Sequence, residues 1–293
     1  MTKSNDTSLA TGKPVWFITG CSTGFGRALA AHVLECGFNA VVTARKPDEV
    51  QDLASKGKAL ILKLDVTDQN EVNEAIHRAE KHFGRIDVLV NNAGIGYFAA
   101  VEEGEEAQAR KMFEVNVFGM GKMIRAALPG MRKQGTGSIV NVSSIGGLVG
   151  FPALGYYNAT KFAVEGLSEA LRKEVEPLGI SVTVVEPSGF RTDWAGRSAN
   201  ESKTQIDAYA ATAGKARSGL RAVSGKQDGD PVRAAQAIVS AIQSPHPPHH
   251  LLLGNAAYEG AMAKLDELRK DFAAGESIAR AADFPTKQQI QGA

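Results

Sequence analysis

Short runs of apolar residues alternate along the chain with longer segments in which apolar residues recur at helical spacing. The runs predict strands at residues 15–19, 39–44, 60–64, 86–90, 138–142, 181–185 and 250–253, and the segments predict helices at 26–36, 70–82, 106–133, 157–175, 231–242 and 257–272. We expect Pro129 to kink or end the helix at 106–133. Because the strands are almost wholly apolar and are separated by helices, the pattern predicts a single α/β domain. It would contain a doubly wound parallel sheet in three α/β/α layers.

One long segment departs from this alternation. Residues 188–230 are rich in Gly, Ala, Ser and Lys, and a compact domain seldom holds such an insert unless it is a lid or a binding segment. We therefore expect a disordered tail at 1–13 and a domain at 14–254 that includes a substrate lid at about 188–230. Residues 255–293 are expected to form a C-terminal helical extension.

Composition excludes several classes of partner. The 33 basic and 32 acidic residues give a net charge of +1, which lacks the basic excess of a general nucleic-acid binder. No window approaches 18 uninterrupted apolar residues, so we expect no membrane partner. Cys21 and Cys36 are too few for a disulfide framework, and we expect both to be buried in a reduced, cytoplasmic protein. His246, His249 and His250 are expected in a surface turn, and no metal site is expected.

A glycine-rich turn follows the first predicted strand. Gly20, Gly24 and Gly26 lie in the sequence Thr-Gly-Cys-Ser-Thr-Gly-Phe-Gly, directly before a predicted helix. Glycines allow the backbone to turn tightly and approach a pyrophosphate, and the start of the helix offers free N–H groups to it. The spacing is Gly-x3-Gly-x-Gly, and a turn of this kind also occurs with a purely structural role. Its position between the first strand and a helix favours nucleotide binding.

Tyr157 and Lys161 are four residues apart in a predicted helix, so their side chains share one face. A tyrosine with its ordinary pKa of about 10 is a poor base at neutral pH. A neighbouring ammonium, and the positive ring of an oxidised nicotinamide, would lower that pKa. Taken alone, the pair is more typical of an exposed helix face than of a catalytic site. Ser144, at the end of a predicted strand, is placed to polarise a substrate oxygen, with Ser143 as the alternative.

These motifs, with Asn-Asn-Ala-Gly at residues 91–94, resemble those of the classical short-chain dehydrogenase/reductase family, over residues 15 to about 253. The resemblance implies a Rossmann-type domain that transfers a hydride between a nicotinamide cofactor and a carbonyl or secondary alcohol. It assigns Tyr157 as general acid or base and Lys161 as the residue that lowers its pKa and binds the ribose. Asn116 matches the family position that helps hold a proton-relaying water. The resemblance also implies a homodimer or homotetramer.

The end of the second strand bears on the choice of cofactor. An NAD site needs an acidic residue there, whereas this chain has Ala44 followed by Arg45 and Lys46. A guanidinium binds a 2′-phosphate, so we expect NADP(H), with use of NAD(H) as the alternative. By resemblance, Asp65 contacts the adenine and Thr192 the nicotinamide carboxamide. The expected cofactor-binding residues are Gly20, Ser22, Thr23, Gly24, Phe25, Gly26, Arg45, Asp65, Val66, Asn92, Ala93, Gly94, Tyr157, Lys161, Pro187 and Thr192.

The substrate pocket is less defined. Its expected residues are Ser144, Tyr97, Phe151, Leu154, Phe190 and Trp194. Their apolar character indicates a hydrophobic ketone or alcohol as the small-molecule partner. An alternative is a non-catalytic NAD(P)-binding regulatory protein with the same fold, although such proteins typically lose the catalytic positions, which are all filled here. An epimerase or dehydratase would fit a Gly-x2-Gly-x2-Gly turn better.

Overall fold

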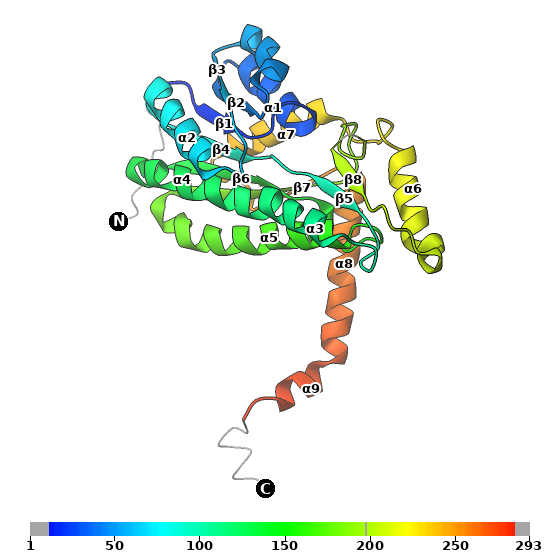
Figure 1. The fold of residues 1–293 in the computed structure, drawn as a ribbon. Helices are drawn as coiled ribbons and strands as arrows, with labels where there is room; N and C mark the ends of the chain where they lie inside the picture. The colour runs from blue at the N-terminus through cyan, green and yellow to red at the C-terminus, as the bar shows by residue number, and fades with distance from the viewer. Residues whose placement is uncertain (1–11, 197, 285–293) are drawn as a thin grey trace.

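A computed structural model of the chain describes residues 12–196 and 198–284 (Figure 1). Its main sheet has seven strands, all parallel, in the order β3-β2-β1-β4-β6-β7-β9. The strands are β1 (Val15–Ile18), β2 (Asn39–Ala44), β3 (Ala59–Lys63), β4 (Val88–Asn91), β6 (Gly137–Val142), β7 (Ile180–Pro187) and β9 (His250–Leu253). The predicted parallel, doubly wound sheet is therefore confirmed. Residues 1–11 and 285–293, which belong to the predicted tail and extension, lie outside the described part of the chain.

Helices cover both faces of the sheet because both faces of each strand are apolar. In β1, Val15 and Phe17 point to one side, where they pack with α2 (Gln69–Phe83), α4 (Met120–Gln134) and α5 (Gly155–Val175). Trp16 and Ile18 point to the other side, toward α1 (Gly24–Glu35), α7 (Pro231–Ile242) and the 3₁₀ helix η1 (Pro47–Lys56). Figure 1 shows the two layers of helices on either side of the strands. Apolar cores therefore lie on both faces of the sheet, and its parallel strands all end at the same edge.

The long predicted helix is one continuous helical rod with an internal irregularity. It consists of α3 (Glu106–Phe113), the π turn η2 (Glu114–Gly119) and α4. Pro129 does not end it, because α4 continues to Gln134. The helix stops only at Gly135, whose φ of 68° is a left-handed conformation that a glycine adopts without strain. Of the two predicted effects of Pro129, a kink or an end of the helix, the end does not occur.

Residues 188–230 form a small lobe that packs against the segment after β4. A second, two-stranded sheet joins β5 (Gly96–Phe98) to β8 (Ala199–Glu201). The lobe continues through η5 (Asp207–Tyr209), η6 (Ala210–Gly214) and α6 (Lys215–Ala222). The sequence pattern predicted neither β5 nor β8, because each is only three residues long.

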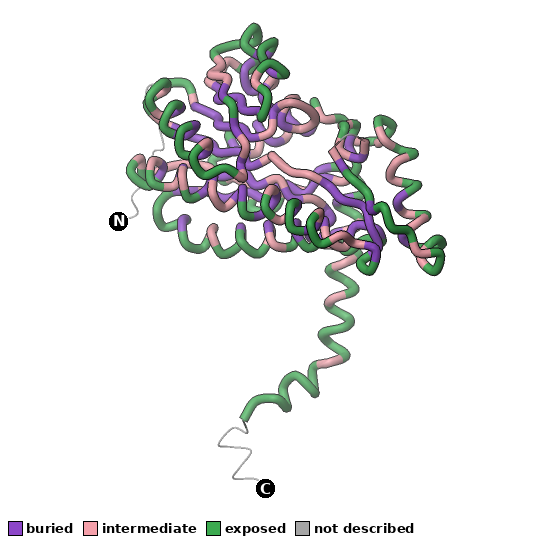
Figure 2. Tube along the Cα trace, in the orientation of Figure 1, coloured by how far each residue is buried: buried purple, intermediate pink, exposed green. Residues whose placement is uncertain are grey.

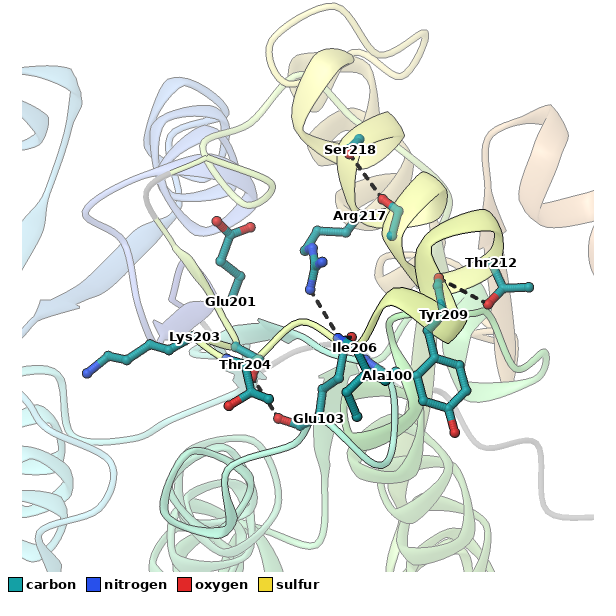
Figure 3. Close-up of polar contacts among 12 residues, drawn as sticks. Ala100, Glu103, Glu201, Lys203, Thr204, Ile206, Tyr209, Thr212, Arg217 and Ser218 are labelled. Carbon is teal, nitrogen blue, oxygen red and sulfur yellow. Dashed lines mark hydrogen bonds and ion pairs between the residues drawn. The ribbon is translucent and has the colours of Figure 1, made fainter.

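The buried carboxylate of Glu103 anchors this lobe (Figure 3). One of its oxygens accepts a hydrogen bond from the backbone N–H of Ile206 at 2.9 Å. The other accepts from the N–H of Ala100 at 3.0 Å and from the guanidinium of Arg217 at 3.3 Å. The bond from Ile206 is the largest cause of the lowered pKa of Glu103, and it outweighs the effect of burial. One carboxylate therefore holds together the loop before α3 and the helix α6.

The C-terminal helices α8 (Asn255–Ala274) and α9 (Glu276–Ala281) extend away from the body of the molecule (Figure 1). Only the start of α8 is attached, through Ala257 and Ala261, which pack on Ile145. Most of both helices is exposed (Figure 2). Within the described residues, no helix has the length and apolar character needed to cross a membrane.

The two cysteines differ in environment. Cys21 is fully buried below the glycine-rich turn, and burial raises the pKa of its thiol to about 12. Cys36 is exposed, so its predicted burial was wrong: it caps the C-terminal end of α1, beyond the face that packs on the sheet. Both are free thiols.

Candidate active site

The glycine-rich turn is tied to the end of β4 by Thr19 and Asn92. The hydroxyl oxygen of Thr19 accepts hydrogen bonds from the N–H groups of Asn92, at 2.9 Å, and Ala93, at 3.0 Å. The side-chain amide of Asn92 donates back to the carbonyls of Thr19, at 2.9 Å, and Gly20, at 3.0 Å. The turn and the Asn-Asn-Ala-Gly segment are therefore one rigid unit. The sequence analysis did not assign this role to Thr19, although a threonine between a buried strand and the first glycine was its signal.

Glycine is required at two positions of the turn, for a different physical reason at each. A β-carbon at Gly26 would lie 2.4 Å from the Asn92 amide nitrogen and 2.4 Å from the Gly20 carbonyl oxygen, so no larger residue fits there. Gly24 has a φ of 59°, and a β-carbon on it would lie 3.4 Å from Thr192. Thr192, far away in sequence, is thus in contact distance of the turn. The first helix begins at Gly24 with no side-chain cap, which leaves its terminal N–H groups free for an anion.

The basic residues after β2 lie at the carboxyl edge of the sheet. Arg45 and Lys46 are exposed, and the buried Ala44 puts no carboxylate at the strand end. Partial burial raises the pKa of Asp65, but two hydrogen bonds from Thr67 and the positive charge of Arg45 outweigh it and lower the pKa overall. Arg45 is therefore close enough to Asp65 to act on it.

The side chains of Tyr157 and Lys161 meet Ser144 at the end of β6. The Lys161 nitrogen donates to the carbonyl of Val142 at 2.8 Å and lies 5.7 Å from the centre of the Tyr157 ring. Burial raises the pKa of Tyr157 to about 12, and a hydrogen bond with Ser144 opposes the shift. Burial also lowers the pKa of Lys161 to about 8, opposed by the charge of Glu165. Desolvation is the largest cause of the tyrosine shift, and the expected lowering of its pKa by an oxidised nicotinamide ring stays a prediction.

The two neighbouring serines have different partners. Ser144 accepts a hydrogen bond from the N–H of Gly146 at 3.0 Å and interacts with Tyr157. Ser143 is buried, and its hydroxyl has no hydrogen-bond partner among the described residues. It lies instead toward Glu165, since a β-carbon at Gly147 would meet both side chains, at 2.6 and 2.8 Å. Of the two, only Ser144 belongs to the group around the tyrosine.

Asn116 lies in the π turn, and its side-chain amide forms three hydrogen bonds inside the protein. Its oxygen accepts from the N–H of Ile95 at 2.9 Å. Its nitrogen donates to the carbonyl of Ile95 at 3.0 Å and to the hydroxyl of Thr160 at 3.1 Å. The side chain thereby joins α3–α4, the segment after β4, and α5.

Comparison with known proteins agrees with this geometry. Residues 14–203 match the sequence profile of the family described as short chain dehydrogenase. The chain belongs to this family. It is 41% identical over 250 residues to an oxidoreductase, BOA17, of Botryotinia fuckeliana, over 84% of this chain and 91% of that one. It is 43% identical over 194 residues to a 3-ketodihydrosphingosine reductase of Bacteroides thetaiotaomicron, and the match covers 66% of this chain and 70% of that one.

Solved structures of short-chain dehydrogenases have the same fold. One from Streptomyces avermitilis superposes with a TM-score of 0.87 at 39% identity, covering 94% of this chain and all, 100%, of that one. The protein ElxO, solved with NADP bound, superposes with a TM-score of 0.70 at 29% identity, and the match covers 84% of this chain and 99% of that one. This chain is therefore an oxidoreductase of the short-chain dehydrogenase/reductase family with a nicotinamide cofactor, acting on CH–OH groups.

The turn of this short-chain dehydrogenase fits such a cofactor. The cradle at Gly26 has no room for a side chain, and the free N–H groups at the start of α1 suit a pyrophosphate. Phe25, within the turn, is half-buried against the core beside α1, and the buried Val66 lies against Gly119. Pro187 ends β7, where it pairs with Leu253 of β9.

The expected substrate residues do not all lie at one place. Trp194 packs on Tyr157, with 4.8 Å between the ring centres, and Tyr97 and Leu154 are buried in the same cluster. Phe190 lies elsewhere, against Phe25 at 4.9 Å between ring centres. Phe151 is partly exposed and lines a separate cavity of ≈ 240 Å³ with Ala99 and other residues. The structure therefore brings Trp194, Tyr97 and Leu154 to Tyr157, together with Ser144, and places Phe190 and Phe151 elsewhere.

We predict that Gly26→Ala weakens NADP(H) binding at least about tenfold, because the added carbon displaces the turn from Asn92. Isothermal titration with NADPH measures the effect. Gly166→Ala is the control: Gly166 is on the exposed face of α5 with open space around it, and its substitution should leave binding unchanged. Equal affinity in the two variants would contradict this account of the turn.

Proposed function

We propose that this enzyme reduces an apolar ketone to a secondary alcohol with NADPH, and that Tyr157 is the proton donor. The observation that carries the proposal is the buried group at the end of β6, in which the side chains of Tyr157, Ser144 and Lys161 converge. Such a group has the parts a carbonyl reduction needs: a phenol that can give up a proton, a hydroxyl that can bind the developing alkoxide, and an amine that can return the proton.

The titration of these groups suits reduction. When bound, the reduced dinucleotide supplies the hydride. Tyr157 donates its proton to the substrate oxygen, while the Ser144 hydroxyl, which accepts from Gly146, donates a hydrogen bond to the same oxygen. A pKa of about 12 keeps Tyr157 protonated at neutral pH, the form that reduction requires. Lys161, with a pKa near 8, then returns a proton to the phenolate.

Asn116 acts in this scheme through the backbone. Both N–H groups of its side-chain amide donate to Ile95 and Thr160, and its oxygen accepts from the N–H of Ile95. A π turn takes backbone carbonyls out of the regular helical pattern. A relay water would therefore be held by a carbonyl of the turn, and Asn116 would fix the turn in place.

The proposed preference for NADPH is supported by charge. A 2′-phosphate at the end of β2 would meet the cations of Arg45 and Lys46, and Ala44 offers no carboxylate to repel it. The ElxO structure, solved with NADP bound, agrees with this preference. Use of NAD(H) is the alternative.

The proposed apolar substrate is supported by the pocket and by a relative. Trp194, Tyr97 and Leu154 surround the tyrosine, and the lobe at 188–230 supplies the tryptophan. The Bacteroides relative is named for the reduction of a ketone with a long lipid chain. We also propose a homodimer or homotetramer in a reducing cytoplasm, in keeping with the family and the two free thiols.

We predict that Tyr157→Phe abolishes turnover, by at least about 10²-fold, while NADPH binding is retained, because the ring remains and only the proton donor is lost. A panel of lipophilic ketones with NADPH consumption as readout provides the assay. Tyr156→Phe is the matched control, since the Tyr156 hydroxyl donates to the Val101 carbonyl away from the site. A wild-type protein that binds NADPH but consumes it with no ketone would favour the regulatory alternative.

We predict that Arg45→Ala raises the KM for NADPH about tenfold and changes the KM for NADH little, because only the 2′-phosphate contact is removed. Arg78→Ala, an exposed cation on α2, controls for net charge. A similar change with both cofactors would show that Arg45 does not read the phosphate.

A further inference from the structure

Glu165 lies one helical turn beyond Lys161 on α5, and the proposed reaction does not use it. Both of its carboxylate oxygens are shielded from solvent and lack a hydrogen-bond partner among the described residues. A carboxylate in this state is costly, because solvent is excluded from it and the nearby Ser143 hydroxyl lowers its pKa by less than burial raises it. Protonation removes that cost.

The groups that face Glu165 come from four elements. They are Lys161 of the same helix, Ser143 at the end of β6, Glu186 of β7 and His250 of β9. The carboxylate oxygens and the ring nitrogen of Glu165, Glu186 and His250 lie within 4.8 Å of one another. The buried Glu186 contacts the ring of His250 at 2.6 Å, and the His250 side chain is 60% exposed. A row of titratable groups thus leads from the catalytic lysine to the surface.

The pKa values of Glu165 and Lys161 allow the two side chains to exchange a proton near neutral pH. Burial, together with the charge of Glu186, raises the pKa of Glu165 to about 7, against opposing effects of Ser143, His250 and Lys161. Burial lowers the pKa of Lys161 to about 8. A proton can therefore pass between the two side chains at little cost.

We propose that Glu165 is the proton store of this active site: it exchanges a proton with Lys161 and is refilled from solvent through His250 and Glu186. This inference rests on the proposed function. In each reduction the O–H bond of Tyr157 breaks as that of the alcohol forms. Lys161 then gives a proton to the phenolate, and Glu165 gives one to Lys161. The carboxylate takes one proton from solvent, so one proton enters per alcohol formed and no electrons move in these steps.

The first test follows Glu165 in the full chain without cofactor or substrate. The infrared difference between wild type and Glu165→Gln should contain the C=O band of a protonated carboxyl, which disappears as the pH rises through about 7. Glu169→Gln is the matched control. Glu169 is one turn further along α5, exposed and paired with Lys173, which lowers its pKa, so its difference spectrum should lack the band at about pH 6.

Stability gives a second readout. Between about pH 4.5 and about pH 7 the folded chain holds more protons at Glu165 than the unfolded chain, so the contribution of this group to stability falls as the pH rises. Glutamine does not titrate, so Glu165→Gln removes this fall in stability with rising pH. The Tm of the variant relative to wild type should therefore rise between about pH 5 and about pH 8, and Glu169→Gln should show no such rise.

Kinetics then connects the carboxyl to turnover. Glu165→Gln should lower kcat about tenfold near pH 8, shift the alkaline limb of the kcat profile to lower pH and raise the solvent deuterium isotope effect, with the KM for NADPH little changed. An ionised Glu165 at about pH 6 would overturn the inference, as would unchanged kcat, profile and isotope effect. Failure of the proposed function would appear separately, as ketone turnover by Tyr157→Phe.

Discussion

The hydrogen bonds that join the ends of β1 and β4 fix the geometry on which the active site depends. Two adjacent parallel strands must both turn away at the same edge of the sheet, and the turns would otherwise be independent. The Thr19 hydroxyl accepts from the backbone after β4, and the Asn92 amide donates to the backbone after β1. This mutual bonding leaves Gly26 no space for a side chain and sets the direction in which α1 begins.

A second constraint is burial along one face of α5. Tyr157, Lys161 and Glu165 are on successive turns, and each is desolvated. Desolvation favours the neutral form of every group, so it raises the pKa of the phenol and of the carboxyl and lowers that of the amine. The pKa values of the lysine and the carboxyl are thereby brought close together, while the phenol stays protonated at neutral pH. Burial along one helix thus sets the protonation states of all three groups.

Much of this architecture could be predicted from the sequence, for identifiable reasons. The strands of the main sheet are buried on both faces, so they appear as uninterrupted apolar runs, and Tyr157 and Lys161 lie at a spacing that only a helix brings together. The short β5 and β8 carry no such pattern, since they pair with each other far along the chain. Phe190 is among the predicted substrate residues, which share an apolar character, but its ring packs on Phe25. The position of a loop residue in the sequence does not show toward which side of the sheet edge its side chain points. Nor could the sequence reveal that Asn116 spends its amide inside the protein, because its partners come from other elements.

The most direct test of the account is the transfer of hydrogen itself. NADPH that carries deuterium at the reactive carbon of the nicotinamide should be incubated with the enzyme and a lipophilic ketone, and the product analysed by mass spectrometry and proton NMR. The account predicts an alcohol with one deuterium on its carbinol carbon and none when Tyr157→Phe replaces the wild type. NADPH that binds tightly but transfers no deuterium to any ketone would contradict it.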